Sequence, residues 1–569
     1  MASPNSRSPG AALGTAALLA VLAAGAAAAA SHPVRARNGM VVAQEAIAAQ
    51  IGAGVLWDGG NAVDAAVATA FALAVTHPTA GNVGGGGFLL YRSASGEAVA
   101  YDFRETAPSG AGPTLFLSGG KYDPKRHHES HLAVGVPGTV AGLHMAWKER
   151  GRLPWRRLLD PAVQLAREGF PVSDGLARSL AGILPKMRPY AASLAQFSRA
   201  GVPYEMGDLL KQPDLAKTLE RIASKGPKGF YEGETASLIE KEMARGGGLI
   251  SRADLAAYRP RVRVPLEGSY RGHQVLAMPP VSSGGVALIQ MLNVLEGYDL
   301  RERGFGSAAT VHLVAETMRR AYADRARHLG DPEFNPHMPV ARLISKEYAR
   351  ELGRTIREDR ASASSPEVFT WPAESGETTH LSVVDADRNA VALTTTLEDG
   401  YGSKIVVPGA GFLLNNEMGD FNAGPGLTDR EGLIGTEPNM AAPGKRMLSS
   451  MTPTILVRAG KPVLVVGSLG GRTIINTVLQ IILNRIDFGM NVQEAVDAPR
   501  FHHQWLPDRI QHERWGLSPD TLELLRARGH QLREVATQGV AQAVAYDPDT
   551  RLLEGAADPR APDSAAAGR

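Results

Sequence analysis

Gly376-Glu377-Thr378-Thr379-His380-Leu381-Ser382 lies deep inside a chain of 569 residues, just ahead of a strong β-hairpin pattern. A threonine hydroxyl is a poor nucleophile unless a base lies beside it. One solution places the threonine at the start of a chain, so that its own α-amine serves as that base. Scission between Glu377 and Thr378 would create such a terminus, which makes this stretch the first candidate for a catalytic site.

The hairpin downstream predicts which residue faces Thr378. Residues 381–384 and 390–396 alternate like two strands around a cluster of turn residues at 385–389. In an antiparallel pair the numbers of facing residues have a constant sum. A turn centred on Asp387 makes that sum 774 and predicts Thr396 opposite Thr378. A second hydroxyl would then lie within reach of the first.

A second hairpin follows in the same half of the chain. Residues 455–457 and 463–466 read as its strands, and Gly470-Gly471 then lead into a helix predicted over 473–486. Backbone N–H groups at such a glycine-to-helix start favour an anion.

The first 376 residues are richer in helical patterns. An Ala-rich pattern predicts a helix over 41–57, and Asn61 predicts the N-cap of a buried helix that ends at Thr76. A glycine loop at 84–87 runs into a strand; it lacks the Lys-Ser/Thr ending of a phosphate loop. Residues 154–258 are mostly helical, and the polar segment 354–376 is the best linker candidate.

Composition excludes several classes of protein. Lys and Arg number 60 against 58 Asp and Glu, so no basic surface for nucleic acid is implied. The absence of cysteine excludes disulfides, thiolate zinc sites and a cysteine nucleophile. His127, His128 and His131 have near metal spacing, but no motif supports a site, so we assign no metal and no cofactor. We expect His502 and His503 to be structural.

The N-terminus predicts an export signal at residues 1–30. Arg7 precedes an apolar run over 11–30, which ends in Ala28-Ala29-Ala30 before Ser31. An uncleaved membrane anchor is the alternative, and the length of the run permits it. We favour cleavage and expect a periplasmic or secreted protein without further contact with a membrane, because no other stretch of 18 apolar residues occurs.

A set of ordered motifs, running from about Asn38 almost to the C-terminus, resembles the γ-glutamyltranspeptidase (glutathione hydrolase) family of N-terminal-nucleophile hydrolases. Any one motif is weak evidence, but the ordered set is specific. The motifs are Gly59-Gly60-Asn61-Ala62-Val63-Asp64-Ala65, the glycines 84–87, Asp102-Phe103-Arg104-Glu105, Gly135-Val136-Pro137-Gly138-Thr139, Thr378-Thr379-His380, Asn415-Asn416-Glu417-Met418-Gly419-Asp420-Phe421, Leu448-Ser449-Ser450-Met451, Gly470-Gly471, and Ala498-Pro499-Arg500-Phe501-His502.

The resemblance implies an α+β fold, a four-layer αββα sandwich assembled from one precursor. A large subunit (31–377) and a small subunit (378–569) would form a heterodimer within that one fold. Thr378 would cut the chain behind Glu377 and then attack γ-glutamyl amides such as glutathione. The acyl group would pass to water or to an amino-acid or peptide amine.

The resemblance also implies a role for each motif residue. Thr396 would hydrogen-bond the nucleophile, and Gly470 and Gly471 would form the oxyanion hole. The remaining residues would bind the glutamyl head group. Arg104, Ser449 and Ser450 match positions that hold its α-carboxylate, and Glu417 and Asp420 match positions that hold its α-ammonium.

Two positions depart from the family pattern. Glu398 stands where well-known members carry Asn, so it is expected to pair with Lys404 or to recognise a different substrate. Glu431, in the lid-like segment 425–436, stands where bacterial members often have Tyr. Both weaken the assignment to glutathione itself. A glutaryl-type acylase and a non-catalytic γ-glutamyl-binding protein therefore stay open as alternatives.

Overall fold

A computed structural model describes residues 31–365, 377–427 and 435–569, and residues Pro33–Arg569 form one compact unit. The expected signal peptide, the last part of the expected linker and Glu431 lie outside the described residues. No helix in the described ranges combines the length and the hydropathy needed to cross a membrane.

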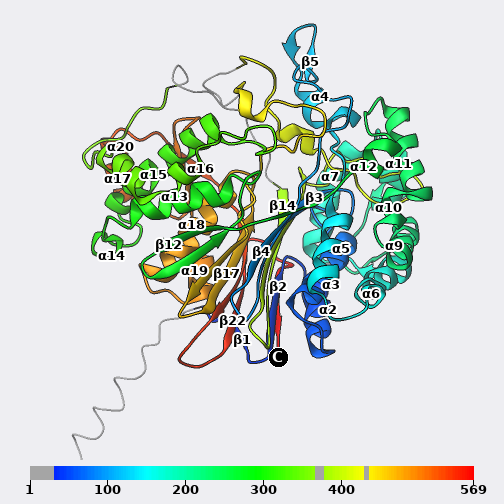
Figure 1. Cartoon of the computed structure of the whole chain (residues 1–569), viewed down its shortest axis with the longest axis horizontal. Coiled ribbons are helices and arrows are strands. Elements are labelled where there is room, and N and C mark those ends of the chain that lie inside the picture. The colour runs from blue at the N-terminus through cyan, green and yellow to red at the C-terminus, as the bar shows by residue number, and fades with distance from the viewer. Residues whose placement is uncertain (1–30, 366–376, 428–434) are drawn as a thin grey trace, which may run out of the picture. The chain divides into compact units, whose positions relative to one another are not determined.

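Two seven-stranded sheets lie at the centre of the unit (Figure 1). The first contains both strands of the second predicted hairpin. Its order is β1 (Val34–Ala36), β22 (Leu553–Ala557), β21 (Val540–Tyr546), β17 (Lys461–Leu469), β16 (Thr454–Arg458), β13 (His273–Ala277), β12 (Leu266–Tyr270). All of its pairs are antiparallel.

The second sheet contains the hairpin that begins at the candidate nucleophile. Its order is β11 (Arg261–Arg263), β4 (Ala98–Phe103), β3 (Gly86–Arg92), β15 (Ala390–Glu398), β14 (Glu377–Asp385), β2 (Gly39–Ala43), β23 (Ala565–Gly568). The strand β14 is therefore central, flanked by β15 and β2. Pairing with β2 begins only at Leu381, so Thr378, near the start of β14, pairs with β15 alone.

The two sheets pack face to face through a shared apolar cluster. Phe88 and Ala392 from the second sheet belong to the same buried cluster as Val465 and Val544 from the first. Leu89, one residue after Phe88, belongs instead to the cluster beneath the helices. This alternation is the period of a strand buried on both faces.

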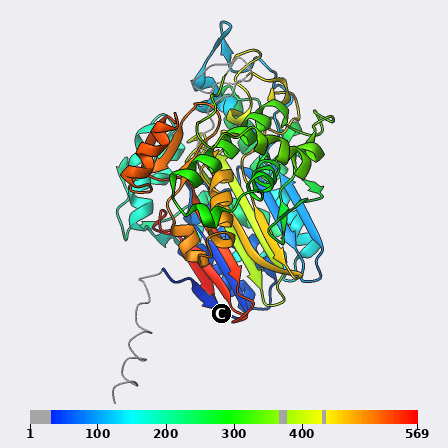
Figure 2. The ribbon, with the colours of Figure 1, turned by 90° about the vertical axis from the view of Figure 1, so that its left-hand side faces the viewer.

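Helices cover the outer face of each sheet, as Figures 1 and 2 show. Over the second sheet the apolar cluster includes residues of α2 (Ala46–Trp57), α3 (Ala62–Thr76), α5 (Thr139–Arg150), α6 (Trp155–Glu168) and α9 (Pro213–Lys225). Over the first it includes residues of α13 (Gly284–Leu295), α15 (Ala308–His328), α18 (Thr473–Ile486) and α19 (Val492–Asp497). The predicted mixture of helices and sheets is confirmed.

The remaining elements complete the described part of the chain. The helices are α4 (Pro124–His128), α7 (Asp174–Met187), α8 (Ala191–Phe197), α10 (Lys228–Tyr231), α11 (Gly233–Gly246), α12 (Arg252–Ala257), α14 (Leu300–Arg303), α16 (Val340–Leu343), α17 (Lys346–Arg354), α20 (Pro519–Ala527) and the 3₁₀ turns η2 (His131–Ala133), η3 (Glu417–Asp420) and η4 (Glu437–Asn439). The strands are β5 (Leu117–Ser118), β6 (Lys121–Tyr122), β7 (Phe170–Pro171), β8 (Ser198–Arg199), β9 (Val202–Pro203), β10 (Leu209–Leu210), β18 (Phe501–His502), β19 (Ile510–Glu513) and β20 (Leu532–Val535).

The helix predicted after Asn61 forms as expected. The Asn61 side chain accepts from the backbone N–H groups of Val63 and Asp64, and Asp64 caps the Asn61 N–H in return. This capping box fixes the start of α3, which is buried along its whole length and ends at Thr76. The predicted helix over 473–486 is also confirmed, with the same bounds, as α18.

The predicted helix over 41–57 is wrong at its start. Residues Gly39–Ala43 form β2, which pairs with β14 on one side and β23 on the other, and the helix begins only at Ala46. The Glu45 side chain caps it by accepting from Ile47 and Ala48. Alanine- and valine-rich residues fit either element, so the pairing partners far along the chain decided the outcome.

Candidate active site

The candidate nucleophile lies where the hairpin arithmetic placed it. Thr378 pairs with Thr396 across β14 and β15, and their hydroxyl oxygens are 3.5 Å apart. Both threonines are buried. The ladder register shifts between Glu377 and Thr378, so the irregularity falls on the peptide bond at which we expect scission.

Thr396 is itself oriented by the backbone. Its hydroxyl oxygen accepts from the N–H of Glu398 at 2.8 Å. Glu398 has φ +78°, which is uncommon for a residue other than glycine and ends the regular strand there. The turn of the chain after β15 therefore sets the position of the hydroxyl that faces Thr378.

The two glycines after β17 form a tight entry into α18. Gly470 has φ +128° and Gly471 has φ +54°. The Gly470 carbonyl accepts from the N–H and hydroxyl of Thr473, at 3.0 and 2.7 Å. A Cβ on Gly470 would lie 2.3 Å from the Thr473 hydroxyl oxygen and 3.0 Å from the Gly539 Cα. Only glycine fits this turn without displacing its neighbours.

Arg104 follows β4 and is fully buried. Its two terminal nitrogens form ion pairs with Glu417 and Asp420. Its Nε donates to the Met447 carbonyl at 3.3 Å, and its own carbonyl accepts from the Tyr258 hydroxyl at 2.9 Å. The structure therefore brings together the predicted cation and both predicted acids of the head-group site.

Electrostatics around Arg104 keep its charge fixed. Burial alone would lower the pKa of this guanidinium, but the carboxylates around it, Glu417 first among them, raise it above its ordinary value. Burial raises the pKa of Glu417, which Arg104 partly offsets, and burial together with Glu417 raises the pKa of Glu105 well above its usual range. The site is thus an acid-rich cluster around one permanent cation.

Ser449 and Ser450 are held by contacts with Ser283 and Arg325 from the first 365 residues. The Ser449 carbonyl accepts from the Ser283 hydroxyl at 2.7 Å. Arg325, buried on α15, donates to the hydroxyls of Ser283 and Ser450 at 2.6 and 2.9 Å. Sequence reasoning missed Arg325. The signal was available, because an arginine on the apolar face of a long helix needs a polar partner.

Glu398 does not pair with Lys404 as one reading predicted. Lys404 pairs with Asp399 at 3.1 Å, and Glu398 contacts the ring Nδ1 of His128, also at 3.1 Å. A Cβ on Gly419 would lie within 2.5 Å of both the Glu398 carboxylate and that nitrogen. The Glu398 side chain therefore lies between α4 and η3.

Two of the histidines around 127–131, His127 and His131, are buried. His127 belongs to α4 and stacks on Phe116 at 3.9 Å between ring centroids, while His131 contacts Glu242 at 2.9 Å. His127, His128 and His131 therefore have different partners. In the described ranges no group of three potential ligands is arranged to hold a metal.

One small cavity joins most of these groups. Its volume is about 20 Å³, roughly the space of one water in this uncut chain. It is lined by Arg104, Thr378, Thr396, Glu398, Asp420, Ser449, Ser450, Met451, Gly471 and Ile474. Two of the predicted catalytic and binding residues are not on its wall: Glu417 pairs with Arg104 without lining the cavity, and Gly470 lines a larger cavity.

The chain is similar to known proteins over most of its length. The sequence model of the family described as γ-glutamyltranspeptidase matches residues 48–568. The glutathione hydrolase proenzyme of Escherichia coli (strain K12) is 49% identical over 542 residues, which are 94% of this chain and 93% of that protein.

Two solved structures are also similar. The crystal structure of cephalosporin acylase from Bacillus halodurans has a TM-score of 0.84 at 29% identity, covering 96% of this chain and 98% of that one. The crystal structure of Helicobacter pylori γ-glutamyltranspeptidase has a TM-score of 0.55 at 47% identity, covering 56% of this chain and 91% of that one.

Proposed function

This chain belongs to the γ-glutamyltranspeptidase family, and from that premise we propose that Thr378 both cuts the chain and carries the acyl group of its substrates. The enzyme is a γ-glutamyl hydrolase and transferase. One observation above all supports the roles of its residues: the paired hydroxyls of Thr378 and Thr396 share a cavity with Arg104, Ser449 and Ser450. The two sheets and their covering helices we assign to the αββα sandwich.

Maturation is the first reaction in the proposal. The Thr378 hydroxyl attacks the carbonyl carbon of Glu377, the acyl group moves from nitrogen to oxygen, and water then cleaves the ester. The products are a large subunit (31–377) and a small subunit (378–569) that stay together as one heterodimer. The new α-amine has a pKa of roughly 7.7–8.0 as a free group, close to working pH for a general base.

The same hydroxyl then attacks the γ-amide carbon of the substrate. The α-amine of Thr378 takes the hydroxyl proton and passes it to the leaving amine. Gly470 and Gly471 donate their N–H groups to the tetrahedral oxygen, and Thr396 holds the nucleophile in place. Water or an acceptor amine releases the acyl group, which restores the free hydroxyl.

The head group is a zwitterion, and the site offers groups of both signs. Arg104, Ser449 and Ser450 bind the α-carboxylate, because a planar guanidinium matches a carboxylate fork. Glu417 and Asp420 bind the α-ammonium. In the uncut chain both carboxylates pair with Arg104. Glu398, held by His128, adds a further acid to the wall of the cavity.

Replacing Gly470 with alanine should lower kcat by about 10²–10³-fold, because the added Cβ displaces one oxyanion donor. The rate of hydrolysis of a γ-glutamyl anilide would measure this. Gly460→Ala is the matched control: Gly460 also has a positive φ (+74°) at the far end of β17, but no atom lies within 4 Å of an added Cβ. An equal loss in both variants would mean that backbone strain, not the oxyanion hole, causes the effect.

A glutaryl-type acylase is the second candidate, favoured by the similarity to a cephalosporin acylase. The acids of the site argue against it, since a glutaryl group has no ammonium for Glu417 and Asp420 to bind. We expect γ-glutamyl anilide to react at least about tenfold faster than glutaryl anilide, as a charge-assisted contact would give. Asp420→Asn should lower the ratio of the γ-glutamyl anilide rate to the glutaryl anilide rate. Faster glutaryl release by the unmodified enzyme would overturn the assignment.

We also propose that residues 1–30 direct export and are removed, so that the enzyme works in the periplasm or outside the cell.

A non-catalytic binding protein would have no need to cut itself. A denaturing gel of the purified protein, with the mass of each band, separates these readings: we expect two fragments, the longer beginning at Ser31.

A further inference from the structure

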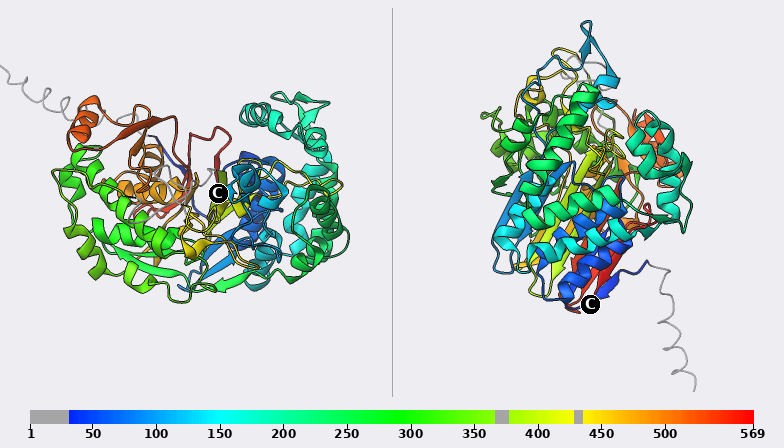
Figure 3. Two further views of the ribbon diagram at one scale, coloured as in Figure 1. Left: turned by 90° about the horizontal axis from the view of Figure 1, so that it is seen from above. Right: turned by 90° about the vertical axis from the view of Figure 1, so that its right-hand side faces the viewer.

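A buried tyrosine on a distant helix contacts the turn that carries the two glycines. Tyr322 lies on α15 and is fully buried. Its hydroxyl donates to the carbonyl of Arg472, the residue directly after Gly471. Figures 1 and 3 show α15, in green, and α18, in orange, on the same side of the sheets. The contact therefore joins the proposed large subunit to the start of α18, which belongs to the small one.

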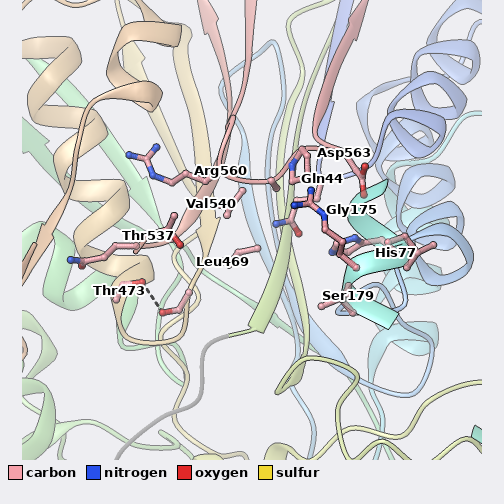
Figure 4. Close-up of a pocket in the computed structure, with 18 of the residues that line it drawn as sticks. Gln44, His77, Gly175, Ser179, Leu469, Thr473, Thr537, Val540, Arg560 and Asp563 are labelled. Atoms are coloured by element: carbon pink, nitrogen blue, oxygen red, sulfur yellow. Dashed lines mark hydrogen bonds between the residues drawn. The ribbon is translucent and has the colours of Figure 1, made fainter. Parts of the chain in front are cut away.

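Hydrogen bonds within the turn set its shape but not its place in the fold. The Thr473 hydroxyl donates to the Gly470 carbonyl at 2.7 Å, the bond drawn as a dashed line in Figure 4. The Ile474 N–H donates to the Gly471 carbonyl at 3.1 Å. Both bonds join residues three positions apart, so the bonded residues would move together. The bond from Tyr322 comes from another element, and it fixes the turn relative to α15.

The ring of Tyr322 is held as well as its hydroxyl. It packs edge-on against the ring of His502, with centroids 5.7 Å apart and planes at 89°. The Nδ1 of His502 accepts from the side-chain amide of Asn476, in the first turn of α18, at 2.7 Å. Tyr322 thus supports the start of α18 at two points, directly at Arg472 and through His502 at Asn476.

The same face of α15 also supports the head-group site. Arg325 follows Tyr322 by three positions, so the two side chains are neighbours on the helix. Arg325 donates to the Ser450 hydroxyl at 2.9 Å. One buried face of the large subunit therefore holds two parts of the small subunit, the serine that we assign to the α-carboxylate and the turn that we assign to the oxyanion hole.

We propose that Tyr322 is a positioning residue of the oxyanion hole: its hydroxyl holds the Arg472 carbonyl and so aims the N–H groups of Gly470 and Gly471 at the tetrahedral oxygen. This rests on the proposed function. Tyr322 is not among the residues that line the small cavity with Thr378, so it acts through the turn and not on the substrate. Oxyanion donors are effective when they are aimed beforehand at the place where charge develops.

Tyr322→Phe tests the proposal, because it removes the oxygen and keeps the ring against His502. As an N-cap carbonyl, that of Arg472 can still accept the first hydrogen bond of α18, so folding should suffer little. We expect kcat for a γ-glutamyl anilide to fall about tenfold, the value of one hydrogen bond. This is less than the roughly 10²–10³-fold loss of a whole donor, because the bonds within the turn remain.

Two inhibitors separate positioning from a general loss of structure. In a boronic acid analogue of glutamate, the boron binds the Thr378 oxygen while the hydroxyl proton passes to the α-amine. The resulting tetrahedral adduct places an oxygen in the oxyanion hole. L-glutamate carries the same head group without a tetrahedral centre. For Tyr322→Phe we expect the Ki of the boronate to rise about tenfold and the Ki of L-glutamate to stay unchanged.

Tyr270→Phe is the matched control, because Tyr270 holds the other end of the same helix. Its hydroxyl, also fully buried, donates at 2.8 Å to Asp487, the C-cap of α18. Arg271 still pairs with Asp487 at 2.6 Å in that variant's sequence context. The control loses the same group from the same helix without touching the turn, so kcat and both inhibition constants should stay unchanged.

Equal losses of kcat in the two variants would overturn the proposal, as would an unchanged kcat in Tyr322→Phe. An equal rise in the Ki of L-glutamate and of the boronate would also contradict it. If Tyr322→Phe stays uncut while Tyr270→Phe is cut, the hydroxyl serves maturation instead, and the proposal is wrong. The proposed function has separate readouts in the unmodified protein: a chain that stays uncut, or one that binds the boronate no more tightly than L-glutamate, would contradict the function itself.

Discussion

Replacing Thr378 with alanine should leave the chain in one piece and abolish activity. The same hydroxyl serves as nucleophile in maturation and in turnover, so its loss removes both reactions at once. Loss of an activated nucleophile costs about 10⁴-fold or more in kcat. Incubation of the purified variant, followed on a denaturing gel and with a γ-glutamyl anilide, should show a single band and no release of the aniline.

The neighbouring threonine offers a matched control. Thr379 is also buried in β14 and pairs with Thr395, but successive side chains of a strand point to opposite faces. Thr379→Ala should therefore still cut and turn over, and Thr378→Ser should do so more slowly. If Thr378→Ala still splits, or the shorter fragment of the unmodified protein begins at any other residue, the nucleophile is misassigned.

The hairpin at the active site could be predicted from sequence because its information is local. Strand alternation and a compact turn near Asp387 are enough to fix the register, and Thr378 does face Thr396. Helix α3 was predictable for a similar reason, since the Asn61 and Asp64 caps are only three residues apart. Roles such as that of Arg104 came from the family resemblance instead, and the structure adds the contacts around it.

Contacts between distant parts of the chain could not be predicted. Val41–Ala43 could form a helix or a strand, and only pairing with β14 and β23 decides between them. The partner of Glu398 is His128, 270 positions away, although Lys404 is much nearer in sequence. Local rules favour near partners, whereas the fold brings α4 beside the end of β15 and so supplies the distant one.

Acid should destabilise this protein strongly between pH 6.5 and 4.5, and His380 should be a main cause. Its ring is fully buried between the sheets, with Nδ1 2.8 Å from the Thr394 hydroxyl and the Gly467 backbone against its face. Burial lowers the pKa of His380 to about 3. In that pH range the unfolded chain binds a proton at this position and the folded chain does not, so stability falls as pH falls.

Each such histidine costs up to about 1.4 kcal/mol per pH unit, or about 2 kcal/mol across this range, because the unfolded imidazole is only half protonated at pH 6.5. Burial also lowers the pKa of His502 to about 3, so His502 should add to the loss of stability in acid.

Urea unfolding of the mature enzyme at pH 6.5 and 4.5 would measure the loss of unfolding free energy. In His380→Asn, which cannot take up the proton, the loss of unfolding free energy between the two pH values should shrink by about 2 kcal/mol. The exposed His337→Asn should leave it unchanged. If His380→Asn loses as much stability as the unmodified enzyme, the ring at position 380 is not held neutral, and the packing between the sheets must tolerate its charge.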